Sequence, residues 1–562
     1  MIQVAFAGHN RANDLGHHPT VIEGLDAAFR LLRDAGASQA RLLTGLATGA
    51  DELAADAWRR AGLGPTHAVF PFLDDPDAPP ISPEGLAQTA TWLDGAATEL
   101  NGRNPHLRQT RLIVETSDLL VVVWTGERAR GAGGTADAVR SALEMGLPVL
   151  WIKPSAPGLL RLIRPEDLPS DFDFTEFLEA LNAGHTAHIE TASPDNLRAA
   201  LNLDARKADE VAEARSSEAS TGWWTRLDNW LHGWLWKTYG AFRRAVGGPP
   251  GPWTEGPAVP ADLASQPGFV ILTQAYLEAD RHANRLAAVH RSEQILLVFA
   301  MVTAALVGSS PAVWPELKVS AVMVELMLGL GAFWVWSSAA QARQHERWSE
   351  ERALAEQLRL ERAGWALGVS LVSTHTKPVR REHGDVGQDT LRNAGLPEGR
   401  FDPDRVRDWG RWAMFELVNG QSAYHRSLSS RDGRIAHRIH LVENTSFVLL
   451  LIILSSYLVV HMAMHALTGE LPHWVSGVVT MASTIVPAVA AATMALEAKL
   501  EFNEQSERSQ AIAERLDKLA ASLGEAPSFS DLQGAARTAM RWHLAQESHW
   551  REGAGRRRLF RP

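Results

Sequence analysis

The chain has 562 residues, of which 45% are apolar and 21% are charged, so it is long enough to form several folded domains. Its net charge of −10 argues against general nucleic-acid binding. Cysteine is absent, which excludes disulfides, thiolate zinc sites and a cysteine nucleophile. The 20 tryptophans, against 4 tyrosines, are typical of a protein that meets a membrane interface.

Residues 1–205 alternate short apolar runs with helical patterns. The runs are IQVAFAG, ARLLTGL, HAVFPF, LLVVVW and LPVLWIK, and helices are expected over 20–35 and 51–61. The runs are apolar throughout, as expected for strands that are covered by helices on both faces. This pattern predicts an α/β, Rossmann-like domain built on a parallel sheet.

A tryptophan-rich segment follows over residues 206–246. Trp223, Leu227, Trp230 and Trp234 recur at helical spacing. Such an amphipathic helix would lie in a bilayer interface or pack against another protein surface, and the sequence leaves both readings open. Residues 247–268 are rich in Pro and Gly and are predicted to be a linker.

The second half changes to an all-α membrane class. Four stretches have the ~20 apolar residues that cross a bilayer. They cover residues 295–313, 319–340, 446–467 and 474–496. Short connections join them in pairs, which predicts two transmembrane helical hairpins.

Charged helices flank each pair and produce a weak internal repeat. The repeat divides this half into a first membrane module at 269–370, a linker at 371–410, a second membrane module at 411–525 and a C-terminal tail at 526–562. Lys318 is the only Lys or Arg in either hairpin tip. By the positive-inside rule, both tips lie outside and both chain termini are cytoplasmic.

Three glycine-bearing turns follow predicted strands of the first domain. They supply the candidate nucleotide-binding residues Gly8, His9, Asn10 and Arg11; Thr44, Gly45, Leu46, Ala47, Gly49, Ala50 and Asp51; and Thr125, Gly126, Glu127, Arg130, Gly133, Gly134 and Thr135. Ligands of open α/β sheets bind beyond the carboxyl ends of the strands, where all three turns are expected. Glycines let the backbone approach a ligand, and helix N-termini favour phosphate.

The motifs GHNR, TGLATGADELAADAW and VFPF, together with the stretch from SDLLVVVW through RGAGGT to LPVLWI, resemble the SLOG domain. This is the Rossmann-like fold of LOG-type nucleotide phosphoribohydrolases and of the DNA-processing protein A family, and the resemblance covers roughly residues 1–155. The second half is more loosely similar to SLATT-type paired-transmembrane modules. Prokaryotic defence systems join the two parts, so the resemblance implies a second-messenger sensor coupled to a membrane effector.

LOG-type enzymes carry a catalytic Glu three residues after the Thr of their glycine turn. Ala138 occupies that position here, and Asp137 is adjacent to it. We therefore predict no catalytic residue and a sensing role. Hydrolysis of a nucleotide or N-glycoside, with Asp137, Asp51 or Glu127 as the carboxylate, is the alternative.

The remaining polar groups of interest are histidines and intramembrane residues. His9, His17 and His18 have no matching carboxylates, so no metal site is predicted. Glu325 and Pro487 are candidates for membrane gating, although Glu325 would also fit a headgroup contact. His461 and His465 read as an interfacial pair.

The combined reading is an antiphage membrane sensor of bacteria. Its expected ligand is a cyclic oligonucleotide or an ADP-ribose derivative, without a cofactor. Its expected partners are the bilayer of the inner membrane, further copies of the chain and a nucleotide-synthesising enzyme. Ligand binding would open a pore or disrupt the membrane.

Overall fold

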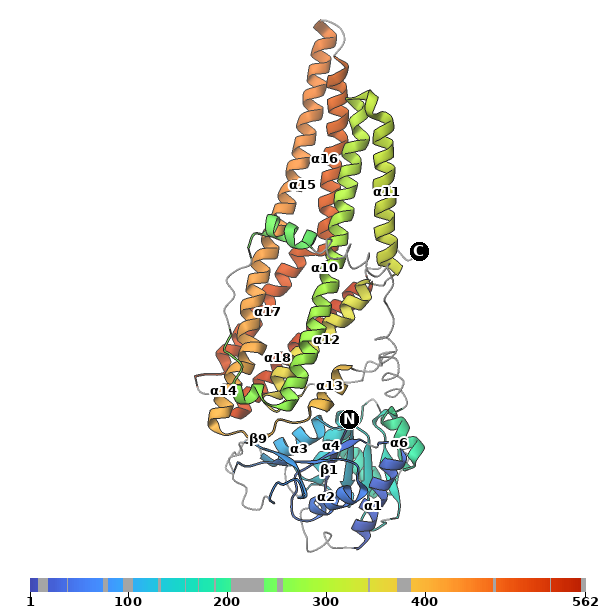
Figure 1. Ribbon diagram of the computed structural model, residues 1–562, viewed down its shortest axis with the longest axis vertical. Coiled ribbons are helices and arrows are strands. Elements are labelled where there is room, and N and C mark those ends of the chain that lie inside the picture. The colour runs from blue at the N-terminus through green and yellow to red at the C-terminus, as the bar shows by residue number, and fades with distance from the viewer. Residues whose placement is uncertain are drawn as a thin grey trace.

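Figure 1 shows the computed structural model, in which a sheet domain lies at one end and long helices extend from it to the other. The structure describes residues 1–8, 19–37, 39–73, 79–93, 105–129, 133–156, 158–169, 171–185, 188–203, 237–249, 256–341, 344–370, 386–467, 472–525 and 527–556.

The described strands form one sheet in the order β8-β7-β6-β5-β1-β2-β3-β4-β9. Their bounds are β1 (Ile2–Ala7), β2 (Ala40–Thr44), β3 (Thr66–Phe70), β4 (Thr89–Trp92), β5 (Leu119–Val123), β6 (Val149–Ile152), β7 (Leu160–Ile163), β8 (Ile189–Thr191) and β9 (Gly399–Arg400). Neighbours from β6 to β9 in this order pair in parallel, whereas β7 and β8 pair antiparallel at the other edge. The sheet is therefore mixed rather than purely parallel, because a connection too short for a crossover helix joins β6 to β7.

Helices cover both faces of the sheet. One face packs against α1 (Pro19–Asp34), α2 (Ala50–Ala61) and α6 (Pro194–Ala200). The other packs against α3 (Pro105–Glu115), α4 (Thr135–Glu144) and α5 (Phe174–Asn182), with the one-turn helix η2 (Pro165–Asp167) before α5. Strands β1, β2, β3, β5 and β6 are buried on both faces, which explains their continuous apolar runs, whereas the edge strand β8 is largely exposed.

All five apolar runs of the sequence are strands, namely β1, β2, β3, β5 and β6, so this part of the prediction is confirmed. The predicted helices also form, as α1 and α2. Strands β4, β7, β8 and β9 were not predicted.

The second half is helical. Its elements are α9 (Ala261–Ala264), α10 (Pro267–Ser309), η3 (Ser310–Ala312), η4 (Pro315–Leu317), α11 (Lys318–Gln341), α12 (Gln344–Trp365), α13 (Val386–Ala394), α14 (Pro403–Met414), the π-helix η6 (Phe415–Asn419), α15 (Gly420–Leu467), α16 (His473–Leu500), α17 (Phe502–Ser522) and α18 (Phe529–Arg556). Helix α10 packs against α11 and α12, α15 packs against α16 and α17, and α16 contacts α10.

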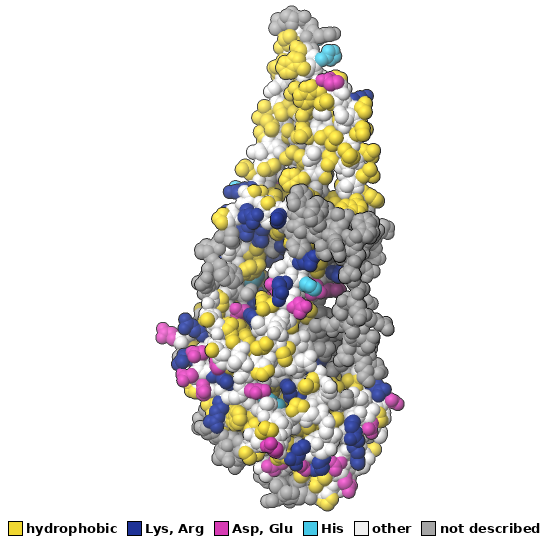
Figure 2. All heavy atoms as spheres, in the orientation of Figure 1, with side chains coloured by type: hydrophobic (Ala, Val, Ile, Leu, Met, Phe, Trp, Pro, Cys, Tyr) yellow, Lys and Arg dark blue, Asp and Glu magenta, His cyan; other side chains and the backbone are white. Residues whose placement is uncertain are grey.

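Four of these helices are long and apolar enough to span a membrane. Helices α11, α15 and α16 contain the second, third and fourth predicted spans, whereas α10 ends at Ser309, before the end of the first predicted span at 313. At most 11% of the residues in each apolar window are buried inside the chain. Figure 2 shows the result as a band of hydrophobic side chains at the end opposite the sheet domain. An exposed surface of this kind fits a lipid environment. Helix α16 passes through Pro487 without a break; the chain breaks instead at Glu501, which has a left-handed φ of 53°.

The two halves share one sheet and one core. Strand β9 pairs with β4 at the sheet edge. The core on the α3–α4 face continues into α10, α12, α14 and α18. Residues expected as a linker over 371–410 are thus folded from residue 386 onward, and most of the expected tail over 526–562 is α18. The expected linker over 247–268 likewise contains α9.

Most of the tryptophan-rich segment, residues 204–236, lies outside the described residues. Its end forms a helix over 237–247. Tyr239, Phe242 and Val246 of this helix pack on a small core made by α10, α15, α16 and the start of α17. The described end of the tryptophan-rich segment therefore packs against protein, which was one of the two expectations for this segment.

Candidate functional site

The sheet changes its winding direction between β1 and β5. From β1 the chain builds outward through β2, β3 and β4 on one side, and through β5 and β6 on the other. At such a switch point the loops diverge to opposite faces and leave a crevice at the carboxyl edge. The three predicted turns follow β1, β2 and β5, so their described parts meet at this edge. We refer to this edge of the sheet, with the three turns on it, as the crevice, after the place where ligands bind in sheets of this topology.

The first turn begins at Gly8, directly after β1. A Cβ atom at this position would collide with the Cβ of Ala50 at the start of α2. The backbone of the turn therefore runs against the N-terminus of α2, and only glycine permits that approach. His9, Asn10 and Arg11, with Arg130 of the third turn, lie outside the described residues, as do His17 and His18.

The second turn joins β2 to α2 and is closed by its own side chains. The Thr44 hydroxyl donates to Asp51 Oδ2 at 3.1 Å and accepts the N–H of Leu46 at 3.2 Å. Leu46 has a φ of 48° and Gly49 a φ of 121°. The left-handed region disfavours a branched-chain residue such as Leu, so the turn holds Leu46 in a strained conformation.

Asp51 lies inside this turn and is buried. Besides Thr44, its carboxyl accepts backbone hydrogen bonds from Ala47, Gly8 and Gly45. Burial raises the pKa of Asp51 to about 7, and the hydrogen bonds oppose that rise. The carboxyl therefore ties the first turn to the second. It points at the turn backbone and acts as a positioning group.

Two polar side chains of helix α3 hold the neighbouring turns in place by hydrogen bonds, which the sequence did not reveal. Gln109 Nε2 donates to the carbonyl of Val69 at 2.6 Å and lies where a side chain on Gly45 would be, 2.7 Å from its Cβ position. The Thr110 hydroxyl donates to the carbonyl of Gly133 at 2.8 Å. Both polar side chains lie on one turn of α3, and no sequence motif marks them.

The third turn ends at the N-terminus of α4. Gly133 has a φ of 83°, and a Cβ there would lie 2.5 Å from the backbone carbon of His106. Its N–H donates to Asp137 Oδ2 at 2.9 Å. Gly134 is the N-cap and provides no side-chain cap. The first N–H groups of a helix have no carbonyl partner within it, so those of Thr135 and Ala136 are suited to an anion.

Two tryptophans fix the start of the third turn. Trp124 Nε1 donates to the carbonyl of Glu127 at 2.8 Å, and Trp151 Nε1 donates to the carbonyl of Trp124 at 2.8 Å. Gly126 has a φ of 93° between them. Thr125 is half-buried, while the Glu127 side chain is exposed.

The carboxylates of the crevice have structural partners. Asp137 caps Gly133 and forms an ion pair with Arg140 at 2.8 Å. Ala138, at the position of the LOG-type catalytic Glu, is 1% exposed and packs in the core. An acid or base for hydrolysis would have to come from Asp51 or Asp137 at the cost of these contacts, or from Glu127.

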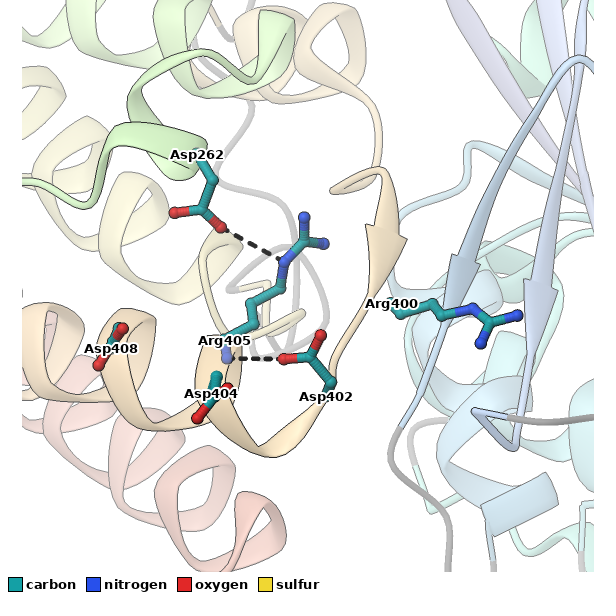
Figure 3. Close-up of a pocket in the computed structure, with 6 residues that line it drawn as sticks. All are labelled: Asp262, Arg400, Asp402, Asp404, Arg405 and Asp408. Atoms are coloured by element: carbon teal, nitrogen blue, oxygen red, sulfur yellow. Dashed lines mark hydrogen bonds and ion pairs between the residues drawn. The ribbon is translucent and has the colours of Figure 1, made fainter.

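A separate acidic pocket of about 320 Å³ lies between α9, β9 and α14. Figure 3 shows its lining residues, Asp262, Arg400, Asp402, Asp404, Arg405 and Asp408. Asp262 accepts from Trp409 Nε1 at 2.8 Å and lies 3.6 Å from Arg405 Nε. Asp402 caps α14 by accepting the N–H of Arg405 at 2.8 Å. These contacts fasten the segment that carries β9 to the helices.

The remaining polar candidates lie away from the crevice. Among the described residues, no group of three or more His, Asp or Glu side chains is arranged to hold a metal ion. A side chain on Gly308 of α10 would collide with the carboxylate of Glu325, so this carboxylate faces α10. The rings of His461 and His465 stack at 6.5 Å on the exposed surface of α15.

Comparison of the chain with protein-family models, with curated proteins and with solved structures finds no match.

Proposed function

We propose that this chain is a membrane-embedded receptor for a nucleotide-derived second messenger, a cyclic oligonucleotide or an ADP-ribose derivative. The ligand's phosphate would bind at the N-terminus of α4, between the turns after β1, β2 and β5. Binding would favour one arrangement of the membrane helices over another, as a receptor requires.

One observation carries this proposal: the strand that bears the crevice also contacts the helical half at its other end. Asp118, just before β5, forms an ion pair with Arg392 of α13. Glu115, at the end of α3, lies 3.4 Å from Arg537 of α18. A shift of β5 or α3 on ligand binding would reach the long helices through these two contacts.

The membrane part of the proposal goes further. The four apolar helices would form two transmembrane hairpins with both chain termini in the cytoplasm of a bacterial cell. Several copies would assemble in the inner membrane and open a pore or disrupt the bilayer, as an antiphage effector. The exposed apolar surface of the helices and the basic residues at their inner ends support this arrangement.

The second candidate function is a membrane-anchored nucleotide or N-glycoside hydrolase. The glycine turns of the crevice favour it as much as they favour a sensor. Three observations disfavour it: Asp137 accepts a hydrogen bond from Gly133, Asp51 is buried among backbone N–H groups, and Ala138 is buried at the position of the catalytic Glu.

A binding experiment on the full chain in nanodiscs tests the proposal. The probes are ADP-ribose and cyclic di-AMP, and the variant is Gly134→Asp. Gly134 has a φ of −73°, which any residue can adopt, and Asp is a favoured N-cap. The new carboxylate would occupy the free N–H groups of α4 without unfolding it, and the affinity for the probe should fall at least about tenfold.

Two controls separate the possible causes. Gly134→Asn caps the helix without a charge and should weaken binding less than Gly134→Asp. Gly146→Asp places the same carboxylate at the other end of α4, where nothing lies within 4 Å of a Cβ, and should leave affinity unchanged. Binding of neither probe to the wild type, or equal affinities for wild type and Gly134→Asp, contradicts the proposal. Probe hydrolysis that follows the affinity supports the enzyme instead.

A further inference from the structure

Five arginines gather where the long helices leave the apolar band. We call them the arginine cluster: Arg243 of helix 237–247, Arg291 of α10, and Arg431, Arg434 and Arg438 of α15. Arg243 lies 3.2 Å from Asp432, a buried carboxylate that also feels the charges of Arg291 and Arg431. Asp432 thus faces three arginines of the cluster, and the described side chains that define the cluster carry more positive than negative charge.

The positive charges of the cluster act on one another. Burial lowers the pKa of Arg431, and the charges of Arg243 and Arg434 lower it further, against the opposing effect of Asp432. Within the described part of the chain, the buried Nε atoms of Arg243 and Arg431 have no hydrogen-bond partner. An anion placed beside the cluster would relieve the repulsion and accept hydrogen bonds from its accessible guanidinium groups.

The cluster lies at the depth of lipid headgroups. Ile295 and Leu496, which mark the inner ends of the first and fourth predicted spans, meet Ile439 in the core beneath helix 237–247. Arg438 directly precedes Ile439. Arg291 lies four residues before Ile295, a rise of roughly 6 Å along the helix. The headgroup layer is about 5–7 Å deep on each side, so Arg291 and Arg438 begin within it, and Arg434, about one turn further along α15, begins at its outer boundary. Figure 2 shows Lys and Arg side chains directly below the apolar band.

Arg434 and Arg438 also hold helix 237–247 in place. Arg434 Nε donates to the carbonyl of Gly247 at 3.2 Å, and Arg438 donates to the carbonyl of Val246. Gly247 fits against α15 because a Cβ there would lie 2.9 Å from the Ile435 side chain. Both guanidinium groups are exposed, and each has five N–H donors, so most of their donors remain for a ligand.

We propose that the arginine cluster binds the phosphate of an anionic phospholipid in the leaflet nearest the sheet domain, and that this lipid fixes helix 237–247 at the membrane surface. The adjoining apolar band would hold the acyl chains, which favours a lipid over free phosphate. The proposal requires that the four apolar helices lie in a bilayer. It does not depend on what the crevice binds, so either proposal can fail alone.

The test measures lipid binding to the full chain in detergent by native mass spectrometry. The probes are phosphatidylglycerol and phosphatidylcholine, added separately. The wild type should prefer phosphatidylglycerol. The double variant Arg434→Gln/Arg438→Gln, which removes both charges and keeps polar side chains, should lose about tenfold or more of its affinity for phosphatidylglycerol and almost none for phosphatidylcholine.

Matched variants distinguish charge from folding. Arg434→Lys/Arg438→Lys keeps the charge and should retain the preference even if the helix contacts weaken. Arg407→Gln, which removes an exposed arginine of α14, should have no effect. Equal binding of the two lipids to the wild type, or an unchanged preference in the Gln variant, overturns the proposal. Loss of the preference in the Lys variant, or displacement of phosphatidylglycerol by equimolar inorganic phosphate, overturns it as well.

Discussion

The two ends of strand β5 differ in chemistry. At its carboxyl end, glycines and backbone N–H groups shape the crevice, and the nearby carboxyls of Asp51 and Asp137 are occupied by the backbone. At its amino end, Asp118 and Glu115 form ion pairs with arginines of α13 and α18. One end offers hydrogen-bond donors to an incoming anion, whereas the other is already bound to the helical half.

Under the proposed function, this difference would let one strand serve two purposes. Neutral backbone N–H groups can bind an anionic ligand by donating hydrogen bonds to it, and no ion pair has to break first. The ion pairs at the amino end join β5 and α3 to the helical half, so a displacement of the strand would reach α13 and α18 through them. We therefore expect substitutions at the carboxyl end to affect binding, and substitutions at the amino end to affect the stability of the joint between the two halves.

The largest effect is expected for Asp118→Ala. Asp118 also accepts a hydrogen bond from the backbone N–H of Gln3 at 2.9 Å. Removing its carboxylate therefore takes one buried partner from Gln3 and one from Arg392. The free energy of unfolding should fall by about 3–5 kcal/mol. Chemical denaturation measures it. Asp408→Ala, which breaks an exposed pair with Arg407, should leave the midpoint nearly unchanged. Equal effects of the two variants would contradict the assigned role of Asp118.

The second prediction concerns pH and the carboxyl end. The folded pKa of Asp51, about 7, lies above its ordinary value of 3.8. The folded state therefore binds more protons than the unfolded state between these values, and stability falls as pH rises from 4 to 7. This contribution amounts to at most about 4 kcal/mol. In Asp51→Asn it should vanish, so wild type and variant should show different slopes of unfolding free energy against pH. Parallel slopes would contradict the burial of a titrating Asp51.

A third, smaller effect is expected at the third turn. Gly133→Ala combines a φ of 83° with a clash against the backbone of His106, and it should cost about 2–3 kcal/mol. Gly146→Ala, with a φ of 78° and open space around it, carries only the strain of about 1 kcal/mol. Thermal unfolding compares the two. A Gly133 variant as stable as the Gly146 variant would show that the turn does not press against α3.

The smallest effect is expected for Arg537→Gln. Glu115 keeps Arg111 as a second partner at 3.6 Å, so the loss should be only about 1 kcal/mol. The variant also tests the coupling between the two halves. Nucleotide affinity should stay unchanged, while the change in ion flux that the ligand causes should become smaller. Arg111→Gln, on the exposed side of Glu115, is the matched control. If Arg537→Gln weakened binding as strongly as Gly134→Asp, the division between the two ends of β5 would be wrong.

The sequence predicted what depends on local pattern. Strands buried on both faces leave continuous apolar runs, so β1, β2, β3, β5 and β6 could be read directly. Strand β4, TATW, is half polar, and β9 is only two residues long within GLPEGRFDP, which reads as a linker. Strand β9 exists because the edge of β4 is available to pair with it, and local sequence cannot show that.

The same limit applies to the crevice. Gly126, Gly133 and Gly49 could be predicted because positive φ values favour glycine. The braces from Gln109 and Thr110 could not, since a polar residue on a helix gives no sign of the distant carbonyl to which it will donate. The sequence shows Arg291, Arg431, Arg434 and Arg438 near the starts of two predicted spans, but it does not show that helix 237–247 lies against α15 and brings Arg243 to them.

The central claim is that the crevice controls the membrane helices, and ion flux from liposomes carrying the full chain tests it most directly. The probe is whichever of ADP-ribose and cyclic di-AMP binds the wild type. We expect saturating probe to raise flux at least about tenfold in wild type and in Gly146→Asp, and to leave Gly134→Asp at its basal level. Equal flux in wild type and Gly134→Asp at saturating probe would contradict the claim and separate the two halves of the molecule.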